Sequence, residues 1–183
     1  MYKINVQIKG IAPLLINGFT DDKPGKKSVD EYRAIALAKL HRDEKGQCCV
    51  TAEMVKSCAI NGIGMAGIKF GRKSFTQFFK ATVFIEPRNI PINTGIKEPD
   101  FIDNRMGRIP PGPRGSAVMI YRPGFNQGWT VNFTLVVQDD KTTNDMIKGA
   151  FEGAGLLSGL GAGRPDFGRF QITKWEVSNA RSK

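Results

Sequence analysis

Hydrophobic and polar residues alternate along the first ten positions of the chain. Ile4, Val6 and Ile8 fall on one side of an extended backbone, and the polar residues between them fall on the other. A period of two is typical of a strand with one buried face. The pattern therefore predicts a strand from Tyr2 to Ile11.

Helical periodicity appears at three places further along. Helices are predicted over 30–40, over 51–68 with Thr51 as the N-cap, and up to about Leu157 with Thr142 or Thr143 as the N-cap. Gly62, Gly64 and Gly67 lie in the second of these helices, and each weakens it by up to about 1 kcal/mol relative to alanine. We therefore expect these glycines to permit either a close approach by another backbone or fraying.

The remaining segments are read as strands and loops. Strands are predicted over 80–86, 117–121, 129–138 and 168–177, and a tight turn over 43–46 precedes a short extended run at 48–50. The turn-rich segment 123–128 predicts that 117–121 and 129–138 pair as an antiparallel hairpin. The polar segment 20–27 predicts a loop. Residues 89–113 contain five prolines and three glycines, which predicts a long loop without regular structure, either functional or disordered.

The order of these elements is strand, helix, strand, strand, helix, strand. This is the ferredoxin-like βαββαβ order of the α+β class, an antiparallel sheet with helices on one face, which leaves the other face or the loops free to bind a partner. We predict one domain over 1–177, with insertions at about 17–50 and 89–116, and a frayed tail over 178–183.

Composition excludes several classes of protein. Of the 183 residues, 40% are hydrophobic and 24% are charged, which is too apolar for a disordered chain. The chain contains neither an apolar run long enough to cross a bilayer nor a signal-peptide core, so a cytoplasmic protein without a membrane partner is expected. Cys48, Cys49, Cys58 and the single histidine, His41, lack the spacing of a zinc site, and we expect buried free thiols, no metal and no cofactor.

The chain is strongly basic. Lysine and arginine number 27 against 17 acidic residues, a net charge of +10. Such a charge suits a polyanionic partner such as nucleic acid. A soluble protein that is merely basic has the same composition, so the position of the charges decides between the two interpretations.

The sharpest local feature is a glycine-rich run at 159–170. Glycines let a phosphate backbone approach the chain closely, and exposed amides together with arginines can bind phosphate. The residues predicted to do so are Gly161, Gly163, Arg164, Gly168 and Arg169. The run follows a helix and precedes a strand, the reverse of a dinucleotide-binding fingerprint, and it lacks the lysine of a P-loop. The alternative is a tight turn at the end of a helix.

This run resembles the glycine-rich loop of the RAMP superfamily, the ferredoxin-like proteins of CRISPR effector complexes. Phe170 stands where the family pattern often closes with glycine, and the segment 13–18 is similar to the superfamily's first strand and turn. The layout also resembles an uncharacterised phage and prophage family through Asp103-Asn104-Arg105, Tyr121-Arg122-Pro123 and the Phe-Gly-Arg-Phe ending. The resemblance implies a module that binds nucleic acid as the crRNA-binding backbone subunit does, without implying an enzyme.

Two further basic segments are candidates for contact with a single strand. The segment 69–80 interleaves four cations with four phenylalanines, of which we expect two to be buried, and its candidate contacts are Lys69, Arg72 and Lys73. The long loop contributes Arg105, Arg108 and Arg114, and Arg122 follows it. The alternative is a set of solvated charges. In the backbone subunits that the resemblance indicates, comparable projections splay the strand and contact the next copy.

The sequence therefore predicts a non-catalytic, largely sequence-tolerant protein that binds single-stranded RNA or DNA. It would act as a homo-oligomer along the strand or as copies in a larger ribonucleoprotein. An endoribonuclease using His41 is one alternative. Paired aspartates, at 21–22 or 139–140, could hold a metal, although such pairs usually make turns. A third alternative is a phage-borne module that docks on a host CRISPR complex.

Overall fold

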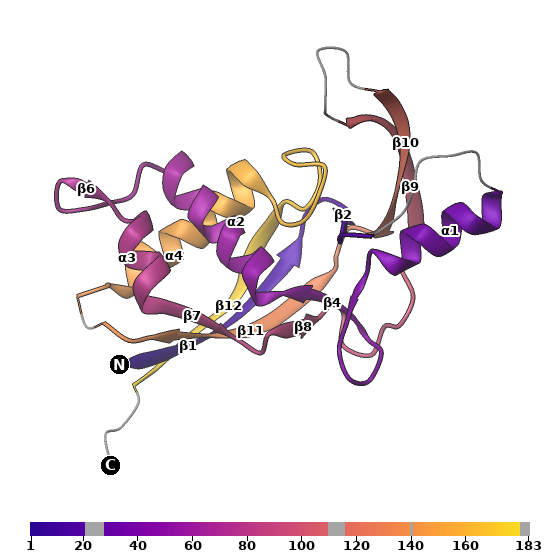
Figure 1. Ribbon diagram of the computed structural model, residues 1–183. Helices are drawn as coiled ribbons and strands as arrows, with labels where there is room; N and C mark the ends of the chain where they lie inside the picture. The colour runs from indigo at the N-terminus through magenta and orange to yellow at the C-terminus, as the bar shows by residue number, and fades with distance from the viewer. Residues whose placement is uncertain (21–27, 110–115, 140, 180–183) are drawn as a thin grey trace.

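The protein has four helices, one π-helical turn and several antiparallel sheets in the part of the chain that the structure describes (Figure 1). This computed structural model describes residues 1–20, 28–109, 116–139 and 141–179. The α+β class predicted from the sequence is confirmed. The loop predicted at 20–27 lies almost wholly outside the described residues.

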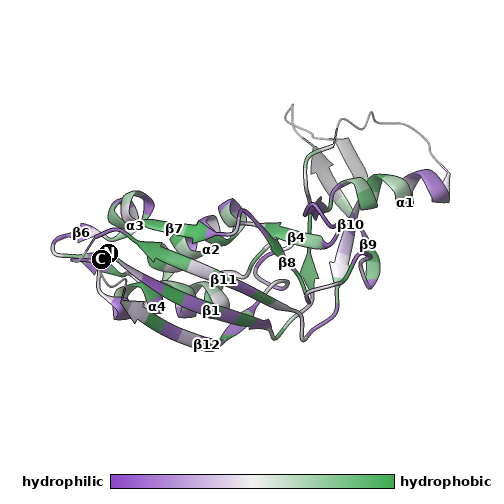
Figure 2. Ribbon diagram, turned by 90° about the horizontal axis from the view of Figure 1, so that it is seen from below, coloured by the Kyte–Doolittle hydropathy of each residue, from purple (hydrophilic) through white to green (hydrophobic). Residues whose placement is uncertain are grey.

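The largest sheet contains four strands in the order β12, β1, β11, β7, and every neighbouring pair is antiparallel. Their bounds are β1 Tyr2–Gly10, β7 Val83–Glu86, β11 Thr130–Val137 and β12 Phe170–Asn179. The predicted alternation along β1 is confirmed, because Ile4, Val6 and Ile8 are buried. The opposite face is polar, and side-chain hydrogen bonds tie Gln7 to Asn132 across the strands. Figure 2 shows hydrophilic stretches along β1 and β12 on this side.

Two helices, α2 (Ala52–Met65) and α4 (Asn144–Gly153), cover the apolar face (Figure 1). Thr51 caps α2, as predicted, and Thr143 rather than Thr142 caps α4. Helix α2 ends three residues before its predicted end, because Gly67 takes a positive φ of 65° and the Ile68 amide donates to the Ile63 carbonyl. A π-helical turn, η1 (Ala154–Ser158), continues α4.

Gly62 is the point at which α2 and α4 meet. A Cβ atom there would lie 2.1 Å from the Ala150 carbonyl oxygen and 2.5 Å from the Ala154 nitrogen. The close backbone approach expected for these glycines is confirmed at Gly62, whereas nothing lies within 4 Å of a Cβ at Gly64.

The segment between α2 and β7 forms a small hairpin, β5 (Lys69–Phe70) and β6 (Lys73–Ser74), followed by α3 (Thr76–Thr82). The prediction of a strand over 80–86 is therefore wrong for residues 80–82, which form the end of α3. Phe75 and Phe79 are fully buried, which confirms the expectation that two of the four phenylalanines belong to the core.

A second, three-stranded sheet projects from one end of the molecule (Figure 1). It consists of β2 (Leu14–Leu15), β10 (Ser116–Phe125) and β9 (Phe101–Ile109), with α1 (Val29–Ala38) beside it. We call the antiparallel pair β9 and β10 the β9–β10 ribbon. The helix predicted over 30–40 is confirmed as α1.

The β9–β10 ribbon corrects two predictions. The segment 89–113 is not without regular structure, since β9 and β8 (Asn89–Pro91) lie within it. The predicted hairpin is also wrong, because β10 pairs with β9 and β2, whereas β11 pairs with β1 and β7. The five prolines that suggested a loop lie outside β9: Pro91 ends β8, Pro99 precedes β9, and the other three lie in 110–113, outside the described residues.

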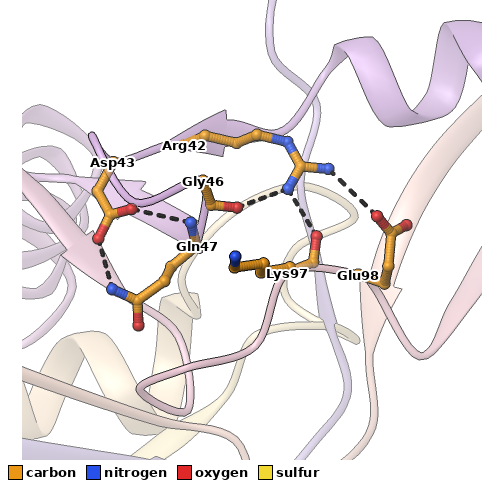
Figure 3. Close-up of polar contacts among 6 residues, drawn as sticks. All are labelled: Arg42, Asp43, Gly46, Gln47, Lys97 and Glu98. Carbon is orange, nitrogen blue, oxygen red and sulfur yellow. Dashed lines mark hydrogen bonds and ion pairs between the residues drawn. The ribbon is translucent and has the colours of Figure 1, made fainter.

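A third sheet joins β3 (His41–Arg42), β4 (Cys48–Thr51) and β8. The turn predicted over 43–46 is confirmed by a hydrogen bond from the Gly46 amide to the Asp43 carbonyl. Arg42 spans this turn and the segment before β9 (Figure 3): its Nη1 donates to the carbonyls of Gly46 and Lys97 at 2.8 and 2.6 Å, and its Nη2 lies 3.8 Å from Glu98. Arg42 therefore fastens the segment that leads into the ribbon.

At the C-terminus, Ser178 and Asn179 belong to β12, so the predicted frayed tail is wrong for these two residues. The rest of the tail is not described. No helix among the described residues is long and apolar enough to cross a membrane.

Candidate nucleic-acid interface

The glycine-rich loop, residues 159–169, joins η1 to β12 and lies against the segment that follows β1. The Ala162 amide donates to the Leu15 carbonyl at 2.8 Å, and the Gly168 amide donates to the Pro13 carbonyl at 2.7 Å. A third bond, from the Leu160 amide to the Gly168 carbonyl, closes the loop on itself at 2.8 Å. Backbone hydrogen bonds from both ends therefore hold the loop in place.

Two glycines of this loop are required by packing. Gly161 has a φ of +78°, and a Cβ there would lie 2.4 Å from the Leu15 carbonyl oxygen. Gly168 has a φ of +74°, and its Cβ would lie 1.8 Å from the Leu160 carbonyl oxygen. Both positions combine a left-handed backbone with a close approach that excludes a side chain. The tight-turn interpretation therefore accounts for the choice of glycine at these two positions, and a binding role has to be argued from the exposed side chains and free amides of the loop.

The glycine-rich loop carries two arginines, Arg164 and Arg169. Both side chains are exposed, and within the described chain neither guanidinium forms an ion pair. The amides of Gly161, Gly163 and Arg164 make no hydrogen bond with the described residues. Free amides beside unpaired arginines form a surface that can bind phosphate oxygens.

A shallow groove of about 530 Å³ lies beside Arg164. Asn61 and Met65 of α2 form one side, and Leu157 and Ser158 of η1 form another. The loop leaves the C-terminal end of η1, where helix carbonyls carry partial negative charge that repels phosphate. Attraction of a phosphate to this groove therefore depends on Arg164, the arginine that lines it.

A buried thiol anchors the start of the loop. Cys58 of α2 donates from Sγ to the Gly159 carbonyl at 3.1 Å. Burial raises the pKa of the Cys58 thiol to about 12, while the charge of Arg164 acts in the opposite direction. Burial likewise raises the pKa of Cys49 to about 11. The expectation of buried free thiols is confirmed for all three cysteines.

We expect the native cysteines to resist a disulfide reagent at pH 8. A shift of the Cys58 pKa from 9.0 to about 12 leaves about a thousandfold fewer thiolates, and burial also blocks access. Because the folded pKa is raised, the neutral thiol stabilises the fold below about pH 9, and this contribution is lost as the pH rises toward 12. The reaction of the cysteines with the reagent is followed by absorbance, and guanidinium-unfolded protein is the control. We expect all three cysteines to react rapidly only after unfolding. Rapid release from native protein at pH 8 would contradict the buried position of Cys58.

The structure brings one arginine of the β9–β10 ribbon to the glycine-rich loop. The guanidinium carbon of Arg105 lies 4.4 Å from the centre of the Phe167 ring, and its Nε donates to Asp103 at 2.9 Å. Arg105 is therefore engaged in joining ribbon and loop. Arg122 lies directly opposite Asp103 in the ribbon and is half-buried, and its Nε and the Asp103 Oδ2 are buried without a partner in the described chain.

Three other predicted contacts lie away from this loop. Lys69, Arg72 and Lys73 are exposed on the β5–β6 hairpin, at the end of the molecule opposite the β9–β10 ribbon (Figures 1 and 2). Arg108 belongs to β9, but its side chain is not described, and Arg114 lies outside the described residues.

The alternative catalytic and metal residues lie elsewhere. His41 begins β3, opposite Cys49, and its neighbours Arg42 and Asp43 hold the turn of the third sheet (Figure 3). The Asp139 carboxylate accepts bonds from the Lys141 amide and the Thr142 hydroxyl. Asp21, Asp22 and Asp140 lie outside the described residues. Among those described, no group of three or more potential metal ligands is found.

Sequence reasoning missed two residues of this site, Phe167 and Cys58. Phe167 holds Arg105, and Cys58 holds Gly159, each across a long stretch of chain. The position of Phe167 between glycines suggests a packed turn, but no local signal identifies its partner.

Comparison with solved structures finds matching chains, whereas comparison by sequence finds none. No family model and no curated protein matches the sequence. The structure is similar to a chain of a complex described as the cryo-EM structure of the type III-B Cmr-beta bound to cognate target RNA. The TM-score is 0.60 over 97% of this chain, the sequence identity is 14%, and this chain spans 61% of the length of that chain. The similarity shows that the two share a fold.

Proposed function

We propose that this protein is a non-catalytic, largely sequence-tolerant module that binds single-stranded nucleic acid. The observation that carries the proposal is the pair of exposed arginines, Arg164 and Arg169, which form no ion pair with any described residue and extend from a loop whose backbone is held by hydrogen bonds. A loop that is already ordered loses little entropy when it binds, and unpaired guanidiniums need not break existing contacts. Phosphate is the group that such a surface recognises in any sequence.

The arrangement of the main sheet supports this function. The strand order β12, β1, β11, β7, with α2 and α4 as crossovers, supports the proposal of a ferredoxin-like βαββαβ unit in which the projecting ribbon is an insertion. This agrees with the resemblance to the RAMP superfamily. The structural neighbour is bound to target RNA, and this property is transferred here only as part of the proposal.

The arginines and the β9–β10 ribbon define a path for the strand. Phosphates contact Arg164 and Arg169 on the glycine-rich loop, and the ribbon held by Arg105 projects beside them. The ribbon also exposes Met106 and Met119, with 77% and 47% of their surfaces accessible. Apolar side chains on such a projection can insert between bases or contact the next copy of the chain.

Size-exclusion chromatography with light scattering tests this function. Protein freed of nucleic acid in high salt is mixed with single strands of increasing length, RNA and DNA in parallel. We expect larger assemblies on longer strands, and an affinity that falls steeply with salt because each neutralised phosphate releases counterions. A protein that keeps its mass with every strand at low salt would contradict the proposal.

Two further assays, RNA cleavage and capture of a protein partner, distinguish the rival functions. Cleavage of labelled RNA that disappears in His41→Ala would identify an endoribonuclease. Capture of a host CRISPR complex that survives nuclease treatment would identify a protein-docking module. We expect intact RNA and capture that depends on the nucleic acid.

A further inference from the structure

A second cavity lies on the other side of the β9–β10 ribbon, between the ribbon and α1. Its volume is about 430 Å³, within the usual range of small-molecule sites. Residues from α1, from the ribbon and from the segment before it line the cavity, and the polar and aromatic ones are Tyr32, Arg33, Asp100, Phe101, Asn104 and Tyr121. Figure 1 shows α1 beside the two strands.

Strand alternation separates this cavity from the glycine-rich loop. Side chains of successive residues in a strand point to opposite faces. Arg105 points toward Phe167, so Asn104 points to the α1 side, and Tyr121 lies directly opposite Asn104 in the register. The cavity is thus a distinct site on the reverse face of the same ribbon.

An aromatic platform is already assembled in the cavity. The rings of Tyr32 and Tyr121 are stacked, with centroids 4.3 Å apart and planes inclined by 17°. Lys39 donates from Nζ to the Tyr121 carbonyl at 2.8 Å, which holds α1 against the ribbon. Both rings are half-buried and line the open space, so a flat molecule can continue the stack. Nucleobases are recognised by single-strand-binding proteins in this way.

Polar groups around the platform are suited to one edge of a base. Asn104 is exposed, and its side-chain amide makes no hydrogen bond within the described residues. An asparagine amide offers a donor and an acceptor, which match N7 and the N6 amino group of adenine. Asp100 accepts a bond from the Asn126 amide through one carboxylate oxygen, Oδ2. Its negative charge disfavours a phosphate inside the cavity and favours an amino group.

We propose that this cavity binds an adenine base, stacked on Tyr32 and Tyr121 and paired through Asn104. The exposed guanidinium of Arg33, next to Tyr32, lies at the rim, where it can contact the attached phosphate. The base belongs either to the bound strand, which rests on the proposed function, or to a free nucleotide, which does not. In a strand, the site adds a preference at one position to otherwise sequence-tolerant binding.

Nuclear magnetic resonance titration of adenosine monophosphate with the full chain tests the site directly. Stacking on the two rings should shift the base protons H2 and H8 upfield, and uridine monophosphate should show a smaller effect. Asn104→Ala should weaken adenosine monophosphate binding about tenfold. Because Asn104 is exposed, this variant should fold, and Gln127→Ala, which removes another exposed side-chain amide outside the cavity, is the matched control.

A second experiment, with oligonucleotides, distinguishes a base within a strand from a free nucleotide. Uridine 12-mers with and without one central adenosine are compared for affinity, and a gain that disappears in Asn104→Ala places the base of a strand in the cavity. Adenosine monophosphate binding without any strand binding supports the cavity and contradicts the proposed function. Strand binding together with equal, Asn104-independent responses to both mononucleotides overturns the cavity proposal and leaves the proposed function intact.

Discussion

Replacing Gly62 with alanine is expected to lower the free energy of unfolding by about 3 kcal/mol, and the Tm by about 10 °C. The added Cβ would lie 2.1 Å from the Ala150 carbonyl oxygen and 2.5 Å from the Ala154 nitrogen. Both are backbone atoms, so no side chain can rotate away and α4 itself must shift from α2. Since η1 and the glycine-rich loop follow α4, the shift should also reach the candidate interface. Chemical and thermal unfolding followed by circular dichroism measure the loss.

Gly64→Ala is the matched control, two residues further along the same helix. Nothing lies within 4 Å of a Cβ at Gly64, and the residue is exposed. Alanine is better than glycine in a helix by about 0.5–1 kcal/mol, so this variant should be more stable than the parent. Equal destabilisation by the two substitutions would show that the helices do not cross at Gly62.

Replacing both Arg164 and Arg169 with alanine is expected to weaken single-strand binding by about tenfold or more at low salt. The loss of two phosphate contacts should also reduce the slope of log affinity against log salt by about 1.4. The reason is that η1 directs its negative end at this loop, so the arginines supply the attraction. Fluorescence anisotropy of a labelled strand over a series of salt concentrations measures both quantities. The Tm should stay unchanged because both side chains are exposed.

The control for net charge is the double variant Arg72→Ala with Lys73→Ala. It removes the same two charges from the β5–β6 hairpin, at the opposite end of the molecule from the β9–β10 ribbon (Figure 1). We expect a smaller loss of affinity from this pair. If both double variants lose affinity equally, overall charge and not the glycine-rich loop attracts the strand.

Local signals were sufficient for several elements. Thr51 and Thr143 cap helices by accepting bonds from amides three residues ahead, and such a contact can be recognised in a short stretch of sequence. The alternation of Ile4, Val6 and Ile8 likewise depends only on the period of a strand. Pairing is different, because turn residues at 123–128 do not specify which strand lies beside β10. Its partners, β9 and β2, are chosen by packing with distant segments.

Residue order alone was enough to predict the α+β class, the main helices, the cap at Thr51, the core face of β1 and the strong positive charge. These follow from residue type and from contacts within a few positions. Which arginines are available for binding depends on the folded structure: Arg105 is held by Asp103 and Phe167, whereas Arg164 and Arg169 stay unpaired within the described chain. The physical reason is that a charged side chain becomes available or engaged through neighbours that strand register and loop packing bring to it.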